Sequence, residues 1–221
     1  MGYCVGSTEK PPAVLSLCSG YGGIERGLCG VFGGVATVAY VEIEAFAVAN
    51  LVDKMEEGRL GAAPIWTDIK TFDATPFRGV VDILTGGYPC QPFSAAGKRA
   101  GADDPRHLWP YIVRIIQDCE PRAVFLENVE GHLSLGVGEV LADLESLGYG
   151  VEAGIFSAAE VGAPHQRKRV FILGDSQSND ERRQPIAAMH RKGEPVRRSS
   201  GGLWPARPGE QQLEWEEPRT D

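Results

Sequence analysis

Short apolar runs alternate with helical patterns along residues 13 to 174, and this alternation is the strongest constraint on the fold. Several runs are apolar without a break, which is typical of strands that are covered on both faces. Strands that alternate with helices predict a doubly wound α/β fold with a mostly parallel sheet, in which ligands bind at the carboxyl ends of the strands. We expect strands at Ala13–Cys18, Val35–Val41, Pro64–Thr67, Val80–Thr85, Ala123–Glu127, Tyr149–Phe156 and Val170–Leu173.

Two segments between these runs carry apolar residues at helical spacing. The first spans His107–Cys119 and the second spans Glu139–Leu147. Both patterns predict a helix with one apolar face. Gly148 directly after the second segment suits a helix C-cap. A further helix is expected after the glycine-rich turn that follows the first strand.

The composition is normal for a soluble globular protein with one core: 221 residues, 43% hydrophobic and 24% charged. No apolar run approaches the roughly 18 residues of a membrane span, and no secretory signal is visible. Five cysteines without a CxxC pair argue against a disulfide framework and a Cys-rich zinc site, and favour a reducing cytoplasm. The net charge of −8 means that any nucleic-acid role must rest on a local basic patch or on a further part.

The chain divides into three parts by composition. Residues 1–12 are predicted to be an N-terminal extension, and residues 13–174 are predicted to be one folded domain. Residues 175–221 are polar and rich in Pro and Gly, with eight Lys/Arg and nine Asp/Glu, and are expected to form a linker or disordered tail. Trp204 and Trp215 are unusual in such a segment, and we expect them to dock on a surface of this chain or of a partner.

A glycine-rich turn follows the first expected strand. Gly20, Gly22 and Gly23 allow the backbone to turn sharply and to approach a ligand. A dinucleotide fingerprint needs glycine where Glu25 stands, and a carboxylate there would face the pyrophosphate. Glu42 ends the next strand, where an acidic residue accepts hydrogen bonds from ribose hydroxyls. This combination fits an adenosyl cofactor such as S-adenosylmethionine.

Asp68, at the end of the third strand, could read the adenine amino group of that cofactor. The sequence leaves open that Glu42 and Asp68 are ordinary polar residues at strand ends.

Cys90 lies in a proline-punctuated loop directly after an apolar run, and four interpretations of it are open. It is a packed thiol, a phosphatase-type nucleophile, a metal ligand or a nucleophile toward carbon. The second lacks its arginine, because Ala96 stands six residues on, and the third lacks a Cys or His at ligand spacing. A nucleophilic thiol needs an exposed, electropositive setting at a strand end. Lys98, Arg99 and Arg106 follow Cys90 and favour the last interpretation.

Two further polar groups lie at strand ends. Glu127 and Asn128 end a buried strand, where a carboxylate can act as a general acid and where a helix-capping pair is the alternative. Arg167 and Arg169 stand at alternate positions entering the last strand, so we expect them to share one face. Arginines on one face suit phosphate or a base carbonyl, with a solvated edge strand as the alternative.

In their order and spacing these motifs resemble the DNA cytosine-5 methyltransferase family. The pair formed by Pro-Cys-Gln and Glu-Asn-Val, each at a strand end, is highly specific. The resemblance implies a Rossmann-like, S-adenosylmethionine-dependent core that methylates carbon 5 of cytosine in double-stranded DNA, as in DNA methylation and restriction-modification. The matching pieces are LCSGYGG, VEIEAF, TDI, GGYPCQPFS, ENV and PHQRKRVFILG.

The resemblance implies a cofactor role for each matching residue. The glycines of the turn would cradle the methionine part, Glu42 would hold the ribose, and Asp68 with Ile69 would hold the adenine. Leu108, at the start of the next helix, looks like a further contact. The full implied set is Cys18, Gly20, Tyr21, Gly22, Gly23, Glu42, Ile43, Asp68, Ile69 and Leu108.

The resemblance also implies covalent catalysis on a cytosine flipped out of the duplex, because a stacked base hides its ring carbons. Cys90 would attack carbon 6 while Glu127 holds and protonates ring nitrogen 3. Carbon 5 would then take the methyl group, and proton loss from carbon 5 would expel Cys90. The implied catalytic residues are Cys90, Glu127, Arg167, Arg169, Pro89 and Asn128, and the implied DNA contacts are Gln91, Ser94, Lys98, Arg99 and Arg106; no metal is implied.

The chain departs from the family pattern in three places. Cys18 stands where the family often has Phe, so it would stack less on the adenine. His165 stands where many members have Gln. Nothing resembles a target-recognition domain or the final Asn-bearing segment of the cofactor pocket. We therefore expect a truncated enzyme, or one subunit of a split enzyme whose partner supplies target recognition. A non-catalytic cofactor- or DNA-binding remnant and an unrelated oxidoreductase are the alternatives.

Overall fold

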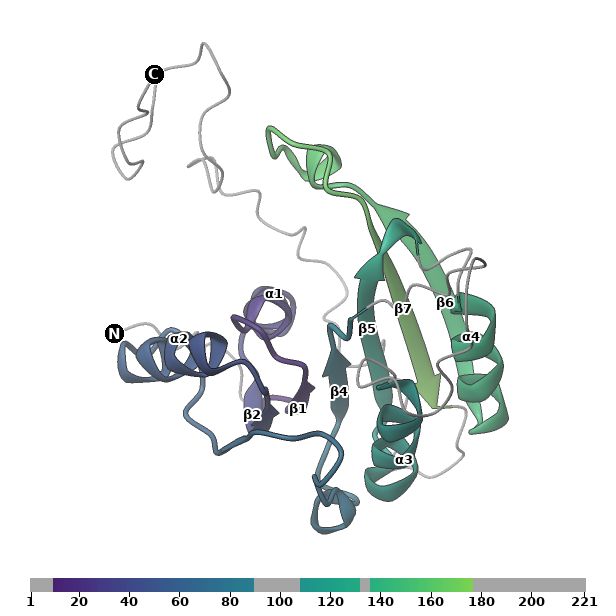
Figure 1. The fold of residues 1–221 in the computed structure, drawn as a ribbon, viewed down its shortest axis with the longest axis horizontal. Coiled ribbons are helices and arrows are strands. Elements are labelled where there is room, and N and C mark those ends of the chain that lie inside the picture. Colours follow the sequence, from purple (N-terminus) through teal and green to yellow (C-terminus); the bar gives the residue numbers. More distant parts are fainter. Residues whose placement is uncertain (1–9, 90–107, 132–135, 177–221) are drawn as a thin grey trace, which may run out of the picture.

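A computed structural model describes residues 10–89, 108–131 and 136–176. These residues form a seven-stranded sheet in the order β3-β2-β1-β4-β5-β7-β6 (Figure 1). The strands are β1 Ala13–Leu17, β2 Ala36–Val41, β3 Ile65–Trp66, β4 Ile83–Gly86, β5 Ala123–Val129, β6 Tyr149–Phe156 and β7 Arg169–Ser176. The helices are α1 Gly23–Phe32, α2 Ala45–Glu56, α3 Trp109–Cys119 and α4 Val137–Ser146, with the short 3-10 helices η1 Thr75–Phe77 and η3 Ala158–Val161.

The sheet is mostly parallel, as predicted. Strands β1 to β5 run parallel to one another, and β7 runs antiparallel between β5 and β6. The last residues of β1 to β5 therefore meet at one edge of the sheet, which we call the carboxyl edge. Because β7 is antiparallel, it begins at this same edge, where Arg169 pairs with Val129.

The ends of the strands differ from the predicted ends for local reasons. β4 begins at Ile83 instead of Val80, because the Val80 and Val81 N–H groups donate to the Phe77 carbonyl in the turn after η1. β1 ends before Cys18, whose φ of 47° is left-handed and cannot continue a strand.

The predicted helices are present, with α3 two residues shorter at its start than expected and α4 shifted toward its N-terminus. Gly148 follows α4 with a φ of 86°, which confirms the predicted C-cap conformation. Helix α2 was not among the predicted elements. In the described ranges no helix has the length and apolar character that crossing a bilayer requires.

One face of the sheet, which we call the closed face, packs against α3 and α4. Its side chains alternate along each strand with those of the opposite face. The closed face forms a continuous core in which Leu84, Leu126 and Ile172 from the sheet meet Ile112 and Leu144 from the helices. All five side chains are almost completely buried.

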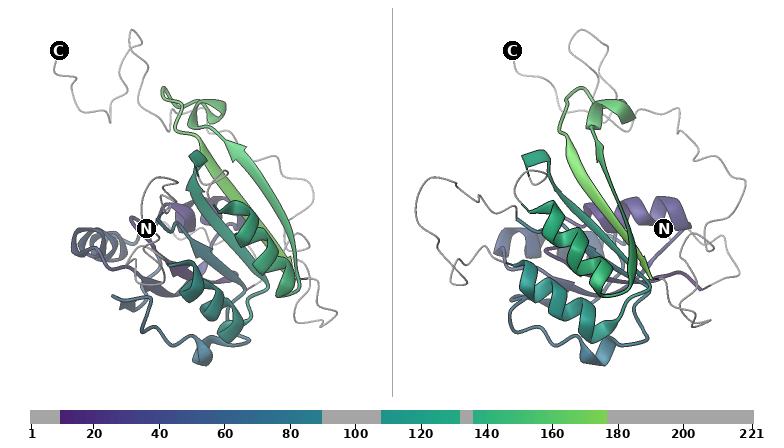
Figure 2. Two further views of the ribbon diagram at one scale, coloured as in Figure 1. Left: turned by 45° about the vertical axis from the view of Figure 1, so that its right-hand side comes forward. Right: turned by 90° about the vertical axis from the view of Figure 1, so that its right-hand side faces the viewer.

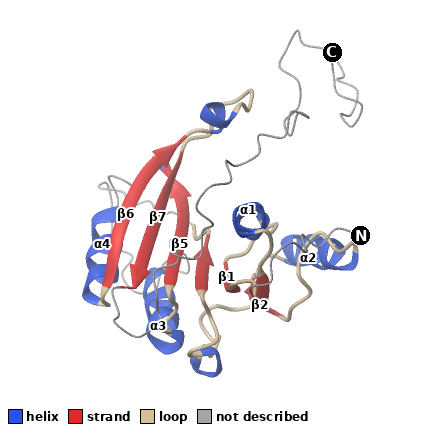
Figure 3. Ribbon diagram, turned by 180° about the vertical axis from the view of Figure 1, so that it is seen from behind, coloured by secondary structure: helices blue, strands red, loops and turns tan. Residues whose placement is uncertain are grey.

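The opposite face is covered only in part. Helices α1 and α2 lie on it near β1, β2 and β4, where Tyr40 packs with Leu51 and Leu60. No described helix lies over this face of β5, β7 and β6, which are visible without cover from behind (Figure 3) and stand apart from α1 and α2 in the side views (Figure 2). We call this uncovered part the open patch; its residues are Phe125, Phe156, Phe171 and Leu173.

Candidate active site

The turn between β1 and α1 closes on Glu42 at the end of β2. Gly20 and Gly22 have φ values of 51° and 71°, which glycine adopts without strain. Glu42 is 7% exposed, and its Oε2 accepts a 2.7 Å hydrogen bond from the Gly20 N–H while Oε1 accepts one of 2.8 Å from the Glu44 N–H. Each carboxylate oxygen carries a second lone pair, so Glu42 can hold the turn and also accept bonds from a diol.

Cys18 lies beside this carboxylate. Burial, and then the negative charge of Glu42, raises the pKa of the Cys18 thiol to about 12. The thiol is therefore uncharged at neutral pH and packs against the core of the closed face. It offers a ligand an apolar contact with less area than an aromatic ring.

The other predicted cofactor residues lie along the same edge of the sheet, and their side chains differ widely in solvent exposure. Asp68 is half-buried, and its Oδ1 accepts a 2.9 Å bond from the Lys70 N–H. Ile43 is 70% exposed, whereas Ile69 is 6% exposed within the core. Leu108 is half-buried directly before α3. The Ile69 side chain is thus a packing group.

Helix α2 holds the remaining residue of that set, Tyr21, in place. Lys54 Nζ donates a 2.7 Å bond to the Tyr21 carbonyl and lies 5.6 Å from the centre of its ring. Burial and the nearby arginines Arg59 and Arg26 lower the pKa of Lys54. Phe46 packs edge-on against Tyr21, with ring centres 6.3 Å apart. Lys54 was not predicted, because α2 was not predicted, and Phe46 lies in the VEIEAF motif but was given no role.

Glu127 and Arg169 form an ion pair at the carboxyl edge. Arg169 lies opposite Val129, so Glu127 is its diagonal neighbour on the same face of the sheet. Arg169 Nε lies 2.6 Å from Glu127 Oε1, with 22% and 26% of the two side chains exposed. The planar guanidinium fixes the carboxylate in direction, so the pair presents Glu127 in one orientation.

The main chain beyond β4 passes close to this carboxylate. A Cβ at Gly87 would lie 3.5 Å from Glu127 Oε2, an ordinary van der Waals distance, so the main chain passes directly beside the carboxylate. Gly87 precedes Pro89, which is exposed, by two residues. The segment that leads into the Cys90 loop therefore runs beside Glu127.

Asn128 points to the closed face, away from Glu127, and is 3% exposed. Its Nδ2 donates a 3.2 Å bond to the Tyr88 carbonyl, and its Oδ1 accepts a 2.8 Å bond from the Val129 N–H. Tyr88 is itself buried, with its ring 5.8 Å from that of Trp109. Asn128 thus anchors the residue directly before Pro89.

Arg167 differs from Arg169 in its surroundings. It is exposed, lies two residues before β7 and has a φ of 29°. The alternation of side chains along a strand does not extend to such a residue, so the argument that the two arginines share a face because of alternation is wrong. Its neighbour Lys168 lies 3.4 Å from Glu130.

Glu25 corrects another expectation. It is 2% exposed and accepts a 2.7 Å hydrogen bond from the Thr85 hydroxyl of β4. Its carboxylate therefore does not face the phosphates of a ligand in the turn. Instead it links α1, which begins at the glycine turn, to β4, which leads to the Cys90 loop.

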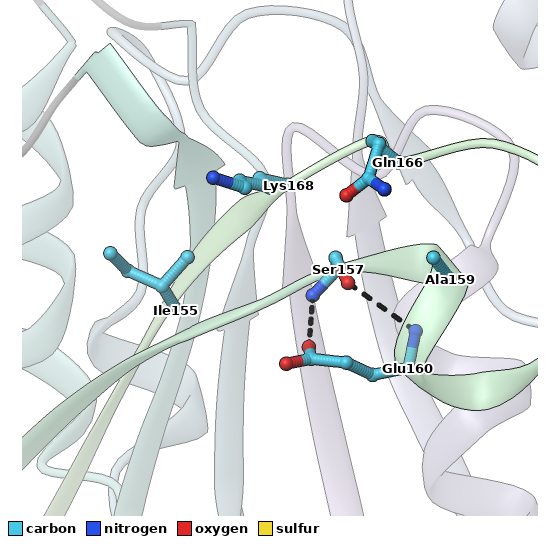
Figure 4. Close-up of a pocket in the computed structure, with 6 residues that line it drawn as sticks. All are labelled: Ile155, Ser157, Ala159, Glu160, Gln166 and Lys168. Atoms are coloured by element: carbon cyan, nitrogen blue, oxygen red, sulfur yellow. Dashed lines mark hydrogen bonds between the residues drawn. The ribbon is translucent and has the colours of Figure 1, made fainter.

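A pocket of about 410 Å³ lies at the tip of the β6–β7 hairpin (Figure 4). Ser157 and Glu160 bond each other there: the Ser157 N–H donates to Glu160 Oε2 at 2.6 Å, and the Glu160 N–H donates to Ser157 Oγ at 3.3 Å. These polar groups cap η3, and no residue of the predicted site lines the pocket. The lining residues are Ile155, Ser157, Ala159, Glu160, Gln166 and Lys168.

Comparison of the sequence with known protein families shows which family this chain belongs to. The sequence model of the C-5 cytosine-specific DNA methylase family matches residues 13–200. The chain belongs to this family. The family match spans every strand and helix described above and extends into the segment after β7.

Curated relatives of this C-5 cytosine methylase chain include bacterial Type II enzymes. Type II methyltransferase M.NgoMIV of Neisseria gonorrhoeae is 35% identical over 167 residues, which cover 72% of this chain and 50% of that protein. M.HgiBI of Herpetosiphon aurantiacus is 36% identical over 171 residues, which cover 75% and 38% respectively. The chain thus spans half, or less, of the length of these relatives.

Solved structures confirm the Rossmann-like methyltransferase fold of this family member. The Dnmt2 methyltransferase of S. pombe superposes with a TM-score of 0.63 at 26% identity, covering 77% of this chain and 52% of that one. A mutant of DNMT2 from Spodoptera frugiperda superposes with a TM-score of 0.64 at 22% identity, over 76% of this chain and 51% of that one, which shows the fold alone.

Several of the predicted site residues lie outside the residues that the structure describes. Cys90 and the expected DNA contacts Gln91, Ser94, Lys98, Arg99 and Arg106 all fall within residues 90–107. Among the residues that are described, no group of three or more His, Cys, Asp and Glu side chains is placed to hold a metal ion.

Proposed function

We propose that this chain supplies the catalytic part of a DNA cytosine-5 methyltransferase that uses S-adenosylmethionine. One observation carries the proposal. The Glu127–Arg169 ion pair lies beside the segment that leads into Cys90, and it shares the carboxyl edge with the glycine turn that closes on Glu42. A fixed carboxylate and a nucleoside site on one edge, beside the residues that precede Cys90 in the chain, suit methylation of a base.

The residues at the turn fit an adenosyl cofactor. Gly20 leaves the backbone bare, whereas the missing side chain of Gly22 makes room for Leu60, and Glu42 offers second lone pairs to ribose hydroxyls. The uncharged Cys18 thiol adds no second negative charge beside Glu42. Asp68 lies at the adjacent strand end, where it would accept a bond from the adenine amino group. When bound, S-adenosylmethionine supplies an electrophilic methyl group.

The chemistry on cytosine follows from the chain's own groups. Cys90, as a thiolate, bonds to carbon 6, and the electrons of the carbon 5–carbon 6 double bond move to carbon 5, which takes the methyl group. Glu127 holds the base at ring nitrogen 3, where a proton draws electrons from carbon 6. Loss of the proton from carbon 5 restores the double bond and expels the sulfur of Cys90. Arg169 keeps Glu127 in the orientation that this contact needs.

Asn128 and Pro89 act on the loop and not on the base. Asn128 fixes the Tyr88 carbonyl, and Pro89 restricts the backbone directly before Cys90. Gln91, Ser94, Lys98, Arg99 and Arg106 remain predicted DNA contacts, and Arg167 remains a predicted contact to the flipped base or its backbone. The basic members among them are suited to phosphate.

We assign recognition of the target DNA sequence to a part outside residues 13–174. Residues 13–174 form the catalytic domain of the proposal, after an extension of residues 1–12. Residues 175–221 would lead toward a target-recognition part, either on the same polypeptide or on a second chain. The bacterial Type II relatives suggest that it acts on double-stranded DNA in a bacterial or phage-infected cytoplasm.

Covalent trapping of a cytosine analogue tests the proposal and does not require recognition of a target sequence. The probe is a duplex with one 5-fluorocytosine opposite an abasic site, because an unpaired base costs less to extract. Fluorine at carbon 5 blocks the final proton loss, so the Cys90 adduct accumulates. We expect a denaturation-resistant protein–DNA adduct that requires S-adenosylmethionine.

Cys90→Ser should abolish the adduct, whereas Cys29→Ser, which alters a half-buried thiol on α1, should leave it. If wild-type protein gives no adduct in the presence of S-adenosylmethionine, the catalytic proposal fails. Calorimetric titration with S-adenosylhomocysteine then separates a cofactor-binding remnant from a chain that binds nothing.

A further inference from the structure

The open patch is an apolar surface that no described element covers. Phe156 is 57% exposed and Leu173 is 39% exposed. Phe125 and Phe171 stack with ring centres 5.6 Å apart, and Phe156 packs edge-on against Phe171 at 5.9 Å. Three aromatic rings and a leucine thus form one continuous surface on neighbouring strands.

Such a surface is out of place on a doubly wound sheet. These folds bury both faces of the sheet beneath helices or other segments. The neighbouring part of the same face obeys this rule, because α1 and α2 lie over it. Contiguous exposed apolar surface on a soluble protein marks an interaction site. The open patch therefore needs an occupant.

Charge argues against a second copy of the chain as that occupant. Residues 177–221 contain eight Lys/Arg and eight Asp/Glu, so the whole net charge of −8 belongs to residues 1–176. Two such bodies repel each other when they dock face to face. The segment 177–221 is formally neutral and meets no such repulsion.

The same segment carries the side chains that an apolar surface selects. It holds two of the four tryptophans of the chain, Trp204 and Trp215, next to Leu203 and close to Leu213. Tryptophan is the residue type most enriched among the anchors of protein interfaces. Arg207 lies between the two tryptophans, and Glu152 borders the open patch, opposite Leu173 in the β6–β7 ladder.

The segment can reach the patch from its point of attachment. It begins directly after Ser176, the end of β7, and Phe171 lies five residues earlier on that strand, or roughly 17 Å away at about 3.3 Å per residue. If the chain from Ser176 to Trp204 behaves as a flexible coil, its mean span is roughly 30 Å. Tethering at this range gives an effective concentration on the order of millimolar.

We propose that Leu203–Trp215 folds back and covers the open patch, with Trp204 and Trp215 against Phe125, Phe156, Phe171 and Leu173. The segment then covers β5, β7 and β6 in the way that α1 and α2 cover β1, β2 and β4. This inference does not depend on the proposed catalytic function.

Fluorine NMR on the full chain labelled with 5-fluorotryptophan tests the docking. Four resonances are expected, and Trp66→Phe, Trp204→Phe and Trp215→Phe assign them. We expect the Trp204 and Trp215 resonances to be displaced from that of free 5-fluorotryptophan. The variant Phe156→Asp/Leu173→Asp should return both to the free position and leave Trp66 and Trp109 in place. Val161→Asp, at a 66% exposed valine outside the patch, is the matched control.

Several results would overturn the proposal. The first is a free position for Trp204 and Trp215 in the unaltered chain, and the second is a displacement that the patch variant does not change. A displacement that depends on protein concentration would identify a second copy as the occupant. If the double variant also shifts Trp66 and Trp109, the milder Leu173→Ser replaces it, and the same readings of Trp204 and Trp215 decide.

Discussion

The two faces of the sheet are built from the same strands yet differ in what they bury. The closed face joins Leu84, Leu126 and Ile172 to α3 and α4 in one apolar core. The other face buries a smaller cluster of Tyr40, Leu51 and Leu60 where α1 and α2 cover it, with Glu25 bonded to Thr85, and it exposes apolar side chains at the open patch. The closed face therefore holds the larger core, and the other face combines a smaller core with exposed apolar surface.

The position of the ion pair supports this division. Glu127 and Arg169 lie on the same face as the open patch, at its carboxyl edge, whereas their neighbours Asn128 and Val170 are buried on the closed face. Successive residues of one strand therefore alternate between the proposed catalytic site and the core. The proposed catalytic groups lie at the edge of the face that no described helix covers.

Replacing one leucine on each face of the sheet with alanine should give the largest difference in the free energy of unfolding. Leu126→Ala removes a fully buried side chain and should lower the free energy of unfolding by about 3 kcal/mol. Leu173→Ala, on the open patch, should cost less than about 1 kcal/mol. Urea unfolding followed by circular dichroism measures both. Equal losses would show that the patch is core.

The buried polar contact under α1 should come next. Thr85→Val removes the hydroxyl that donates to Glu25 and leaves a buried carboxylate without this bond, at a cost of about 2 kcal/mol. Thr85→Ser retains the donor and should recover most of the loss in the same urea assay. A neutral Thr85→Val would mean that Glu25 does not link α1 to β4 energetically.

Much of this architecture could be predicted from the sequence. The apolar runs fixed the strands to within a few residues, and the alternation with helices predicted the mostly parallel sheet. Helix α2 was not predicted, and neither was Lys54, because most of its residues are apolar while only Ala47 and Leu51 are buried, so its sequence does not show one distinct apolar face. The lack of a covering helix over β5, β7 and β6 could not be predicted. Periodicity shows which residues of a strand share a face of the sheet, but not which element packs on that face.

The candidate site was predictable in part for the same reason. Glu42 lies where the strand end placed it, and Glu127 meets Arg169 because β7 runs antiparallel, which the sequence did not reveal. The orientation of Glu25 could not be predicted, because position in a turn does not fix which way a side chain points. Arg167 was assigned by strand alternation, but the strand begins two residues after it.

Cofactor binding should show a smaller effect at the carboxyl edge. Glu42→Gln keeps the shape but weakens the bonds that the carboxylate accepts from Gly20 and Glu44. We expect the Kd for S-adenosylhomocysteine to rise about tenfold, equivalent to about 1.4 kcal/mol. Isothermal calorimetry measures it, with the exposed Glu57→Gln as the control. An unchanged Kd would remove Glu42 from the site.

The most gradual expected effect is a loss of stability at alkaline pH, which is spread over several pH units. Burial raises the pKa of the Cys119 thiol, on the closed face, to about 12. Between about pH 9 and pH 12 the unfolded chain has lost this proton and the folded chain retains it, so stability falls as pH rises. The slope is about 1.4 kcal/mol per pH unit at most. Cys119→Ala should flatten it in urea titrations at pH 8 to 10.5, and an unchanged slope would contradict the assignment.

The identity of the methylated atom tests the central claim most directly. A duplex with one unmodified cytosine opposite an abasic site is incubated with the protein and S-adenosylmethionine, then digested to nucleosides for mass spectrometry. We predict 5-methylcytosine with the unaltered chain and none with Cys90→Ser. A methyl group on the exocyclic amino nitrogen, or the same yield of 5-methylcytosine from Cys90→Ser, would contradict the account.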